Sequence, residues 1–299
     1  MLWVTEIPEM RRIVSRWHRA GGKVGFVPTM GYFHQGHLAL MEKARAENDY
    51  VAVSLFVNPT QFGPGEDFAC YPRDLERDRR LAEETGVDAL FHPAPETMFP
   101  GDYQTYVEVT GLSQGLCGAS RPGHFRGVAT VVTKLFNIIT PDRAYFGEKD
   151  AQQLRVIKKM VVDLNLPVEI RAVPTVREED GLAMSSRNAY LTPEERRQAT
   201  ALYQSLLWAK ERLAAGERDP AYLTAGMQRI LAGYPLVKLE YLEFRDDESL
   251  APLMEIKGKV LLAIAARVGT ARLIDNITVD VKTGAHERGS ENATGSLPE

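Results

Sequence analysis

Two histidines, His34 and His37, lie where an apolar run gives way to a helical pattern. Residues 24–28 are typical of a buried strand, and residues 38–47 have apolar side chains at helical spacing. Side chains three apart at a helix start share one face, beside unpaired backbone N–H groups and the positive end of the helix dipole. Gly36 lies between them and would let a ligand approach the backbone. The pattern favours a phosphate-binding site over two ordinary surface histidines.

Two amides, Asn58 and Gln61, follow a second expected strand at residues 50–56. Amide side chains orient carboxylates and hydroxyls through hydrogen bonds without adding a charge. Asn-Pro is also ordinary turn chemistry, so this segment alone does not distinguish a turn from a binding site.

A charged cluster begins at Gly147, between an expected strand at residues 144–146 and an expected helix. Lys149 offers an ammonium for phosphate oxygens, and the Asp150 carboxylate can accept hydrogen bonds from ribose hydroxyls. Gln153 lies one helical turn further on and can face the same space. Charged helix starts are often merely solvated, but the position after a strand favours a nucleotide site.

A fourth segment reads Met184-Ser185-Ser186-Arg187. Two hydroxyls followed by a guanidinium can hold a polyphosphate. Serine-rich junctions are commonly linkers, but apolar Leu182 and Met184 favour a packed loop. The segment lies at the junction of two expected domains, where a hinged lid would be placed.

These motifs need a fold that gathers them. Over residues 1–174, strand-like runs alternate with helical patterns, which predicts a parallel sheet with right-handed crossovers. Ligands bind such sheets beyond the carboxyl ends of the strands. The fold class is therefore α/β, with a Rossmann-like doubly wound N-terminal domain. Expected strands are 24–28, 50–56, 89–92, 105–109, 144–146 and 168–173, and expected helices are 38–47, 74–85, 127–139 and 151–164.

A smaller α+β domain is expected over residues 175–283. Thr192, Pro193 and Glu195 form a capping box with proline at N1, which predicts a helix up to residue 215. A second helix is expected at residues 220–232. Segments 236–245, 259–268 and 272–281 predict a small antiparallel sheet. Residues 284–299 are polar and contain glycine and serine, which predicts a disordered tail.

The composition is ordinary for a globular protein: 299 residues, 44% hydrophobic, 25% charged and a net charge of −4. The chain has no long basic block, so its charge pattern does not indicate a nucleic-acid-binding surface. Cys70 and Cys117 lack the spacing of a zinc or redox motif. Residues 1–12 lack the apolar region of a signal peptide, and no segment reaches the length of a membrane span. We therefore expect a cytoplasmic protein without nucleic-acid or membrane partners.

Four segments in order carry a specific resemblance: PTMGYFHQGH, FVNPTQFG, FGEKDAQQ and REEDGLAMSSRN. H-x-G-H with a later M-S-S-R segment resembles the class I adenylate-forming nucleotidyltransferases, where that segment corresponds to an M-S-K-S-type loop. The four together resemble the pantothenate synthetase (pantoate–β-alanine ligase) family over residues 1–281.

The resemblance implies an enzyme that condenses (R)-pantoate with β-alanine through a pantoyl adenylate, consuming ATP with Mg²⁺ and releasing AMP and pyrophosphate. It also implies a homodimer formed through the N-terminal domain. By similarity, Gln61 and Gln153 bind pantoate, with Asn58 beside them and Gln61 also near β-alanine. The implied catalytic residues are His34, His37 and Lys149, and the Mg²⁺ ligands stay unidentified. By the same resemblance, Val176 holds the adenine through its backbone, and residues 184–187 close over the β- and γ-phosphates. The implied ATP site comprises Met30, His34, Gly36, His37, Gly147, Lys149, Asp150, Val176, Met184, Ser185, Ser186 and Arg187.

The implied chemistry has two different demands. The pantoate carboxylate is already a nucleophile, so its attack on ATP needs charge stabilisation rather than a base. The β-alanine amine must then lose a proton, and no side chain in these motifs is an obvious base; His37 is one candidate. Because an acyl adenylate hydrolyses easily, we expect a closed cavity with the second domain as its lid.

Two other classes of protein remain as alternatives. One is another adenylyl-transferring enzyme, such as a class I aminoacyl-tRNA synthetase or a phosphopantetheine adenylyltransferase. It would leave the NPTQFG and GEKDAQQ segments unexplained, and the chain shows no basic anticodon-binding domain. The other is a non-catalytic nucleotide-binding protein, which would be expected to have lost His37, Lys149 or Ser185.

Overall fold

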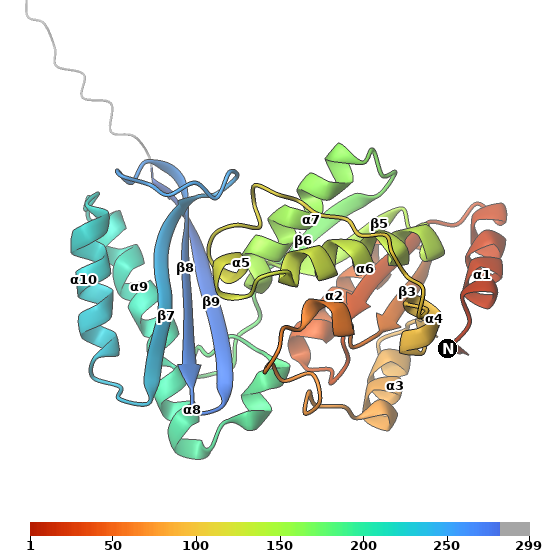
Figure 1. Ribbon diagram of the computed structural model, residues 1–299, viewed down its shortest axis with the longest axis horizontal. Helices are drawn as coiled ribbons and strands as arrows, with labels where there is room; N and C mark the ends of the chain where they lie inside the picture. Colours follow the sequence, from red (N-terminus) through yellow and green to blue (C-terminus); the bar gives the residue numbers. More distant parts are fainter. Residues whose placement is uncertain (282–299) are drawn as a thin grey trace, which may run out of the picture.

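The computed structural model describes residues 1–281, which form two sheets placed side by side (Figure 1). The larger sheet belongs to the N-terminal part of the chain and the smaller one to the C-terminal part. The predicted disordered tail, residues 284–299, lies outside the described residues.

The larger sheet has six strands in the order β1-β4-β3-β2-β5-β6, and all of its pairs are parallel. After β2, the chain adds β3 and β4 on one side of that strand, and it then crosses over to add β5 and β6 on the other side. Such a reversal of strand order opens a crevice at the carboxyl ends of the strands. The strands are β1 (Leu2–Val4), β2 (Val24–Thr29), β3 (Tyr50–Leu55), β4 (Ala89–Phe91), β5 (Arg143–Gly147) and β6 (Glu169–Val173).

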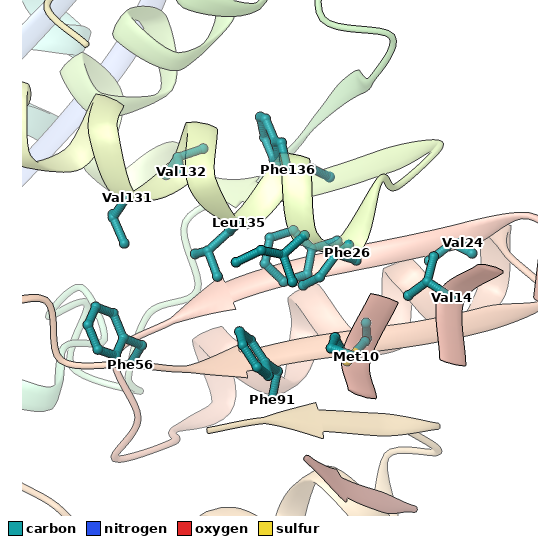
Figure 2. Packing of buried hydrophobic residues seen from close by; sticks show 14 of the residues in the cluster. Met10, Val14, Val24, Phe26, Phe56, Phe91, Val131, Val132, Leu135 and Phe136 are labelled. Atoms are coloured by element: carbon teal, nitrogen blue, oxygen red, sulfur yellow. The ribbon is translucent and has the colours of Figure 1, made fainter. Parts of the chain in front are cut away.

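Helices cover both faces of this sheet, as the alternation of apolar runs and helical patterns predicts. On one face, the core packs Met10 of α1 and Phe136 of α6 against Phe26 and Phe91 of the strands (Figure 2). On the other face, Met41 of α2 packs with the opposite side chains of the strands. The helices of the first face are α1 (Ile7–Arg19), α6 (His124–Ile139) and α7 (Ala151–Asp163); those of the second are α2 (Gln35–Glu47) and α3 (Leu75–Glu84).

The smaller sheet is antiparallel, in the order β7-β8-β9, and is covered by α9 and α10 (Figure 1). Its strands are β7 (Val237–Asp246), β8 (Gly258–Val268) and β9 (Ala271–Val281), and its helices are α8 (Pro193–Ala199), α9 (Ala201–Ala214) and α10 (Pro220–Leu231). The capping box at Thr192 is present, with Glu195 as its partner. The single helix predicted from 192 to 215 divides at Thr200, whose hydroxyl bonds to a backbone carbonyl of the preceding turn.

Short elements connect these units. They are α4 (Pro95–Met98), α5 (Cys117–Ser120) and the 3-10 turns at Pro59–Gln61, Glu148–Asp150 and Ser186–Tyr190. Apolar side chains of the two parts pack together: Leu116 and Ala151 contact Leu261 and Ala263 of β8. No helix within residues 1–281 is both long and apolar enough to span a bilayer.

One predicted strand, residues 105–109, is wrong. The segment is irregular, although Val107 and Val109 do pack against the apolar core. The N–H of Val107 donates to the hydroxyl of Thr130 on α6 at 2.9 Å, so a side chain of a helix takes the place of a neighbouring strand. The short strand β1 and helix α1 were not predicted.

Candidate active site

Every residue singled out from the four motifs as a site residue lines one cavity of about 220 Å³ at the carboxyl ends of β2, β3 and β5. The four motifs therefore meet, although they are spread from Met30 to Arg187. The lining includes Met30, His34, Gly36, His37, Asn58, Gln61, Gly147, Lys149, Asp150, Gln153, Val176, Met184, Ser185, Ser186 and Arg187.

The two histidines begin α2 and bond to its first turn through their rings. Nδ1 of His34 accepts the N–H of Gly36 at 3.1 Å, and Nδ1 of His37 accepts the N–H of His34 at 3.3 Å. A ring nitrogen that accepts a hydrogen bond carries no proton, so the proton of each neutral ring is on Nε2. The ring centroids are 4.1 Å apart. The pair thus offers two adjacent N–H donors at the cavity.

The surroundings keep both rings neutral. Burial, with the positive charge of Lys149 next in weight, lowers the pKa of His34 from 6.5 to about 4. Burial, reinforced by His34 and Lys149, lowers the pKa of His37 well below its usual value. A triphosphate placed here would oppose this shift because negative charge favours the protonated rings.

Two details of the sequence interpretation need correction. The N–H groups of Gly36 and His37 are not unpaired, because the first bonds to a His34 ring nitrogen and the second to the His34 carbonyl at 2.8 Å. A Cβ on Gly36 would lie 2.9 Å from Cε1 of His34. The glycine therefore makes room for the imidazole, and the rings, rather than these amides, are the donors.

The carboxylate of Asp78, on α3, is buried and fixes the backbone just before the two histidines. The sequence did not indicate this residue. Its two oxygens accept the N–H groups of Tyr32 and Phe33, each at 2.6 Å. Gly31 and Tyr32 have left-handed backbones, with φ of 86° and 54°. Tyr32 is strained there because its side chain disfavours positive φ. The two hydrogen bonds to Asp78 offset this strain and fix the turn that precedes the histidines.

Gln61 is held in a defined orientation. Its Oε1 accepts from Nδ2 of Asn58 at 3.1 Å, and its Nε2 lies 3.2 Å from Sδ of Met30. Asn58 also donates to the carbonyl of Gly127 on α6 at 3.2 Å. The amide nitrogen of Asn58 is fully engaged within the protein, so Asn58 positions Gln61, and both residues line the cavity.

Three further residues that the sequence interpretation missed support the same turn. Nδ1 of His124 lies 2.8 Å from the carbonyl of Gln61, and its Nε2 lies 3.0 Å from Arg121. Arg121 in turn makes a two-point ion pair with Glu66. Burial, with the charge of Arg121 next, lowers the pKa of His124 to about 4, so it donates to Gln61 as a neutral ring. The run R-P-G-H at residues 121–124, whose histidine begins α6, is a signal in the sequence that could have indicated these residues.

The charged cluster after β5 presents its side chains to the cavity with few internal partners. Within residues 1–281, Lys149 has no carboxylate at ion-pair distance, and the side chain of Gln153 has no hydrogen-bond partner. Both side chains are therefore available to a ligand. The adjacent Asp150 also lines the cavity.

The Ser-Ser-Arg loop is tied down on both sides. The Ser185 side chain accepts the N–H of Arg187, and the Ser186 hydroxyl donates to the carbonyl of Tyr32 at 3.3 Å. The Arg187 guanidinium makes a two-point pair with Asp67, with both distances 2.8 Å. The loop thus bridges the histidine turn and the segment after Gln61. Its predicted role on phosphates remains a prediction, and Arg187 would have to leave or share Asp67 to fulfil it.

Val176 and Met184 join the same assembly. The N–H of Met184 donates to the carbonyl of Val176 at 3.0 Å, so the predicted adenine-binding and phosphate-binding segments are directly connected. Among the described residues, no group of three or more histidine, cysteine or acidic side chains has the arrangement of a metal site. Cys70 is exposed and Cys117 is buried, and both are free thiols.

A doubly wound parallel sheet with these donors at its carboxyl edge defines a nucleotide-binding α/β protein. Comparison with known proteins makes the assignment specific. The family described as pantoate-beta-alanine ligase matches residues 2–278. The chain belongs to the pantoate–β-alanine ligase family.

Relatives match along nearly their whole length. The chain is 58% identical to a pantothenate synthetase from Thermotoga neapolitana, over 91% of this chain and 98% of that protein. Among solved structures, the pantothenate synthetase of Thermus thermophilus is 51% identical with a TM-score of 0.89, covering 93% of this chain and 99% of that one. A pantoate-beta-alanine ligase from Francisella tularensis, complexed with beta-gamma ATP and beta-alanine, is 34% identical with a TM-score of 0.76, over 93% and 97%.

Proposed function

We propose that this protein joins (R)-pantoate to β-alanine at the expense of ATP, forming pantothenate, AMP and pyrophosphate. The observation that carries the proposal is the meeting of all four motifs in one cavity, in a chain that matches the ligase family over residues 2–278. The relative from Francisella tularensis, solved with beta-gamma ATP and beta-alanine, supports the nucleotide and the amine substrate.

In this proposal, the nucleotide lies along the histidine turn, the cluster at Lys149 and the Ser-Ser-Arg loop. The Nε2–H donors of His34 and His37 face the phosphates, and so does the ammonium of Lys149, which has no ion-pair partner within residues 1–281. These groups oppose the negative charge that develops as the α-phosphorus is attacked. Met30 and Val176 contact the parts of the nucleotide other than its phosphates.

Pantoate binds between Gln61 and Gln153, which reach the cavity from opposite sides of the β2 end. The first glutamine is pre-oriented by Asn58 and Met30, while the side chain of the second has no hydrogen-bond partner in the described part of the chain and can adapt to the ligand. Holding the pantoate carboxylate in line with the α-phosphorus turns a bimolecular step into a unimolecular one. The carboxylate oxygen attacks, the bond to pyrophosphate breaks, and pantoyl adenylate forms.

β-Alanine then attacks the acyl carbon of the adenylate, and AMP leaves with the electron pair of the broken bond. Before attack, the ammonium of β-alanine must release a proton. His37 is neutral here because its pKa is well below the usual value. A neutral ring takes up a proton on its unprotonated nitrogen, which in His37 is the Nδ1 that accepts the N–H of His34, so His37 can serve as the candidate for proton transfer only when that hydrogen bond opens.

Mg²⁺ belongs to the proposal as the partner of the triphosphate. Within residues 1–281, Asp150 is the acidic side chain that lines the cavity, and the protein offers no cluster of three ligands. Mg²⁺ commonly binds through one or two carboxylates and substrate phosphates, and this donor set fits that pattern. Asp150 would hold the ion, which adds charge neutralisation at the phosphates.

The organisation of the chain is part of the same proposal. Residues 1–174 act as the catalytic domain and residues 175–283, described up to 281, as a second domain that closes the cavity. The loop from Val176 to Arg187 belongs to that second domain and lines the site. We further propose a cytoplasmic homodimer formed through the N-terminal domain, which the family resemblance implies. Light scattering coupled to size exclusion would measure the assembly directly.

AMP release from ATP tests the reaction, and we expect it to require both pantoate and β-alanine. Exchange of labelled pyrophosphate into ATP that needs pantoate alone would support the adenylate intermediate. An enzyme that releases AMP with an amino acid and tRNA, or that binds ATP without turnover, would refute the proposal. His37→Ala should depress the pantoate-dependent exchange, and near-normal exchange would remove His37 from the phosphate site.

A further inference from the structure

Two adjacent residues of β9, Asp275 and Asn276, reach out of the small sheet toward the nucleotide loops. Their exposed fractions are 4% and 8%, so both polar side chains are almost fully buried. In Figure 1, β9 is the strand of the small sheet that faces the larger one. Buried polar side chains at such a junction need partners, and their partners are informative.

The amide of Asn276 holds the turn that carries Lys149. Its Nδ2 donates to the carbonyl of Glu148 at 3.1 Å and to the carbonyl of Lys149 at 2.8 Å. A primary amide has two N–H donors, and both are used on one 3-10 turn. Since the Lys149 side chain has no ion-pair partner in the described part of the chain, its position depends on where this backbone is held.

Asp275 holds the neighbouring segment. Its carboxylate makes a two-point ion pair with Arg177, at 2.7 and 2.8 Å. Arg177 also donates to the carbonyl of Gly181 and lies 3.7 Å from the ring centroid of Tyr203. Its backbone directly follows Val176, so fixing the guanidinium fixes the predicted adenine-binding position. Two-point pairs of this kind restrict geometry as well as adding energy.

We propose that Asp275 and Asn276 are positioning residues for the nucleotide: one strand of the second sheet sets the places of both Lys149 and Val176. The pair links two ATP-binding segments that lie 27 positions apart in sequence. The inference rests on the proposed nucleotide roles of Lys149 and Val176. It assigns the small sheet a role in ATP affinity. The Asn58–Gln61 turn, which is proposed to position pantoate, is held by α6 instead.

Asn276→Ala tests the proposal, with Thr278→Ala as its matched control. Thr278 lies two residues along the same strand and its hydroxyl donates to Asp247, the residue directly after β7. Titration calorimetry with a non-hydrolysable ATP analogue should show binding about tenfold weaker for Asn276→Ala, which corresponds to about 1.4 kcal/mol. Thr278→Ala should bind like the wild type. In steady-state kinetics, KM for ATP should rise while KM for pantoate changes little.

Equal nucleotide affinity in folded Asn276→Ala and wild type would overturn the proposal. So would a uniform loss for ATP and pantoate, because a merely structural residue would affect both. If Asn276→Ala does not fold, Asn276→Asp keeps the shape and removes the amide donor. The wild type gives a further reading: the analogue should slow hydrogen exchange in residues 271–281 as well as 147–150, and unchanged exchange in 271–281 would count against the proposal. A wild type that fails to bind the analogue would instead refute the proposed function.

Discussion

Gly127 of α6 provides a sharp test of how pantoate is held. A Cβ at this position would lie 2.3 Å from the carbonyl oxygen of Thr60 and 2.7 Å from Cα of Gln61. Helix α6 is anchored in the core, and Asn58 bonds to the Gly127 carbonyl, so neither side moves freely. Gly127→Ala must therefore displace the Asn58–Gln61 turn by about 1 Å to restore an ordinary contact.

A displacement of about 1 Å in a positioning group can cost roughly 10²-fold in rate. We therefore expect kcat/KM for pantoate to fall by about two orders of magnitude in Gly127→Ala. Affinity for the ATP analogue should change much less, because the histidine turn and Lys149 do not touch Gly127, although Gln61 contacts Met30 of the ATP site. Overpacking should also lower stability by about 1–3 kcal/mol.

The assay varies pantoate at saturating ATP and β-alanine and follows AMP release. Gly101→Ala is the matched control, since nothing lies within 4 Å of a Cβ at that glycine. A folded Gly127→Ala enzyme with wild-type kcat/KM for pantoate would refute the reasoning that Gln61 selects pantoate from a fixed position.

Three further predictions follow from the site. Gln153→Ala should weaken pantoate binding and spare ATP binding in calorimetry; equal loss of both would contradict the separate roles of the two glutamines. Asp67→Asn leaves the Arg187 guanidinium without its carboxylate, so the protein should lose stability and ATP should raise Tm more than in the wild type; an identical ATP-induced rise would exclude a phosphate role for Arg187. His34 and His124 have pKa values of about 4 in the folded protein against 6.5, so the unfolded chain binds more protons between these values. Stability should be level above about pH 6.5 and fall toward pH 4, by roughly 2–3 kcal/mol for each histidine, in denaturant titrations; a flat profile would contradict the neutral buried rings.

Much of the fold was readable because its signals are local. Buried strands such as β2 and β3 are continuous apolar runs, and α2 and α7 have apolar faces at helical spacing. Helix α1 carries such a signal too, with Pro8 at its start and the buried Met10, Ile13 and Val14 at helical spacing, although it is not among the helices expected from the sequence. The motifs were placed correctly because parallel strands bring their carboxyl ends together.

The remainder depends on contacts between residues far apart in sequence. β1 is three residues long and is a strand only because it pairs with β4, which lies beyond residue 88. Asp78 and His124 act on turns 45 and 63 residues away, and Asn276 on one 127 residues away. A single sequence shows no periodicity for such pairs. Their residue types are ordinary until the fold places them together.

The apolar contact between the two sheets has a consequence for how the molecule unfolds. Leu116, Ala151, Leu261 and Ala263 bury one another across the boundary. Separating the sheets would expose these side chains, and each large apolar residue contributes about 1.5–3 kcal/mol when buried. The two parts should therefore melt as one cooperative unit rather than as two successive domains. The small sheet, cut away at residue 175, would carry an uncovered apolar face and should not persist as a folded monomer.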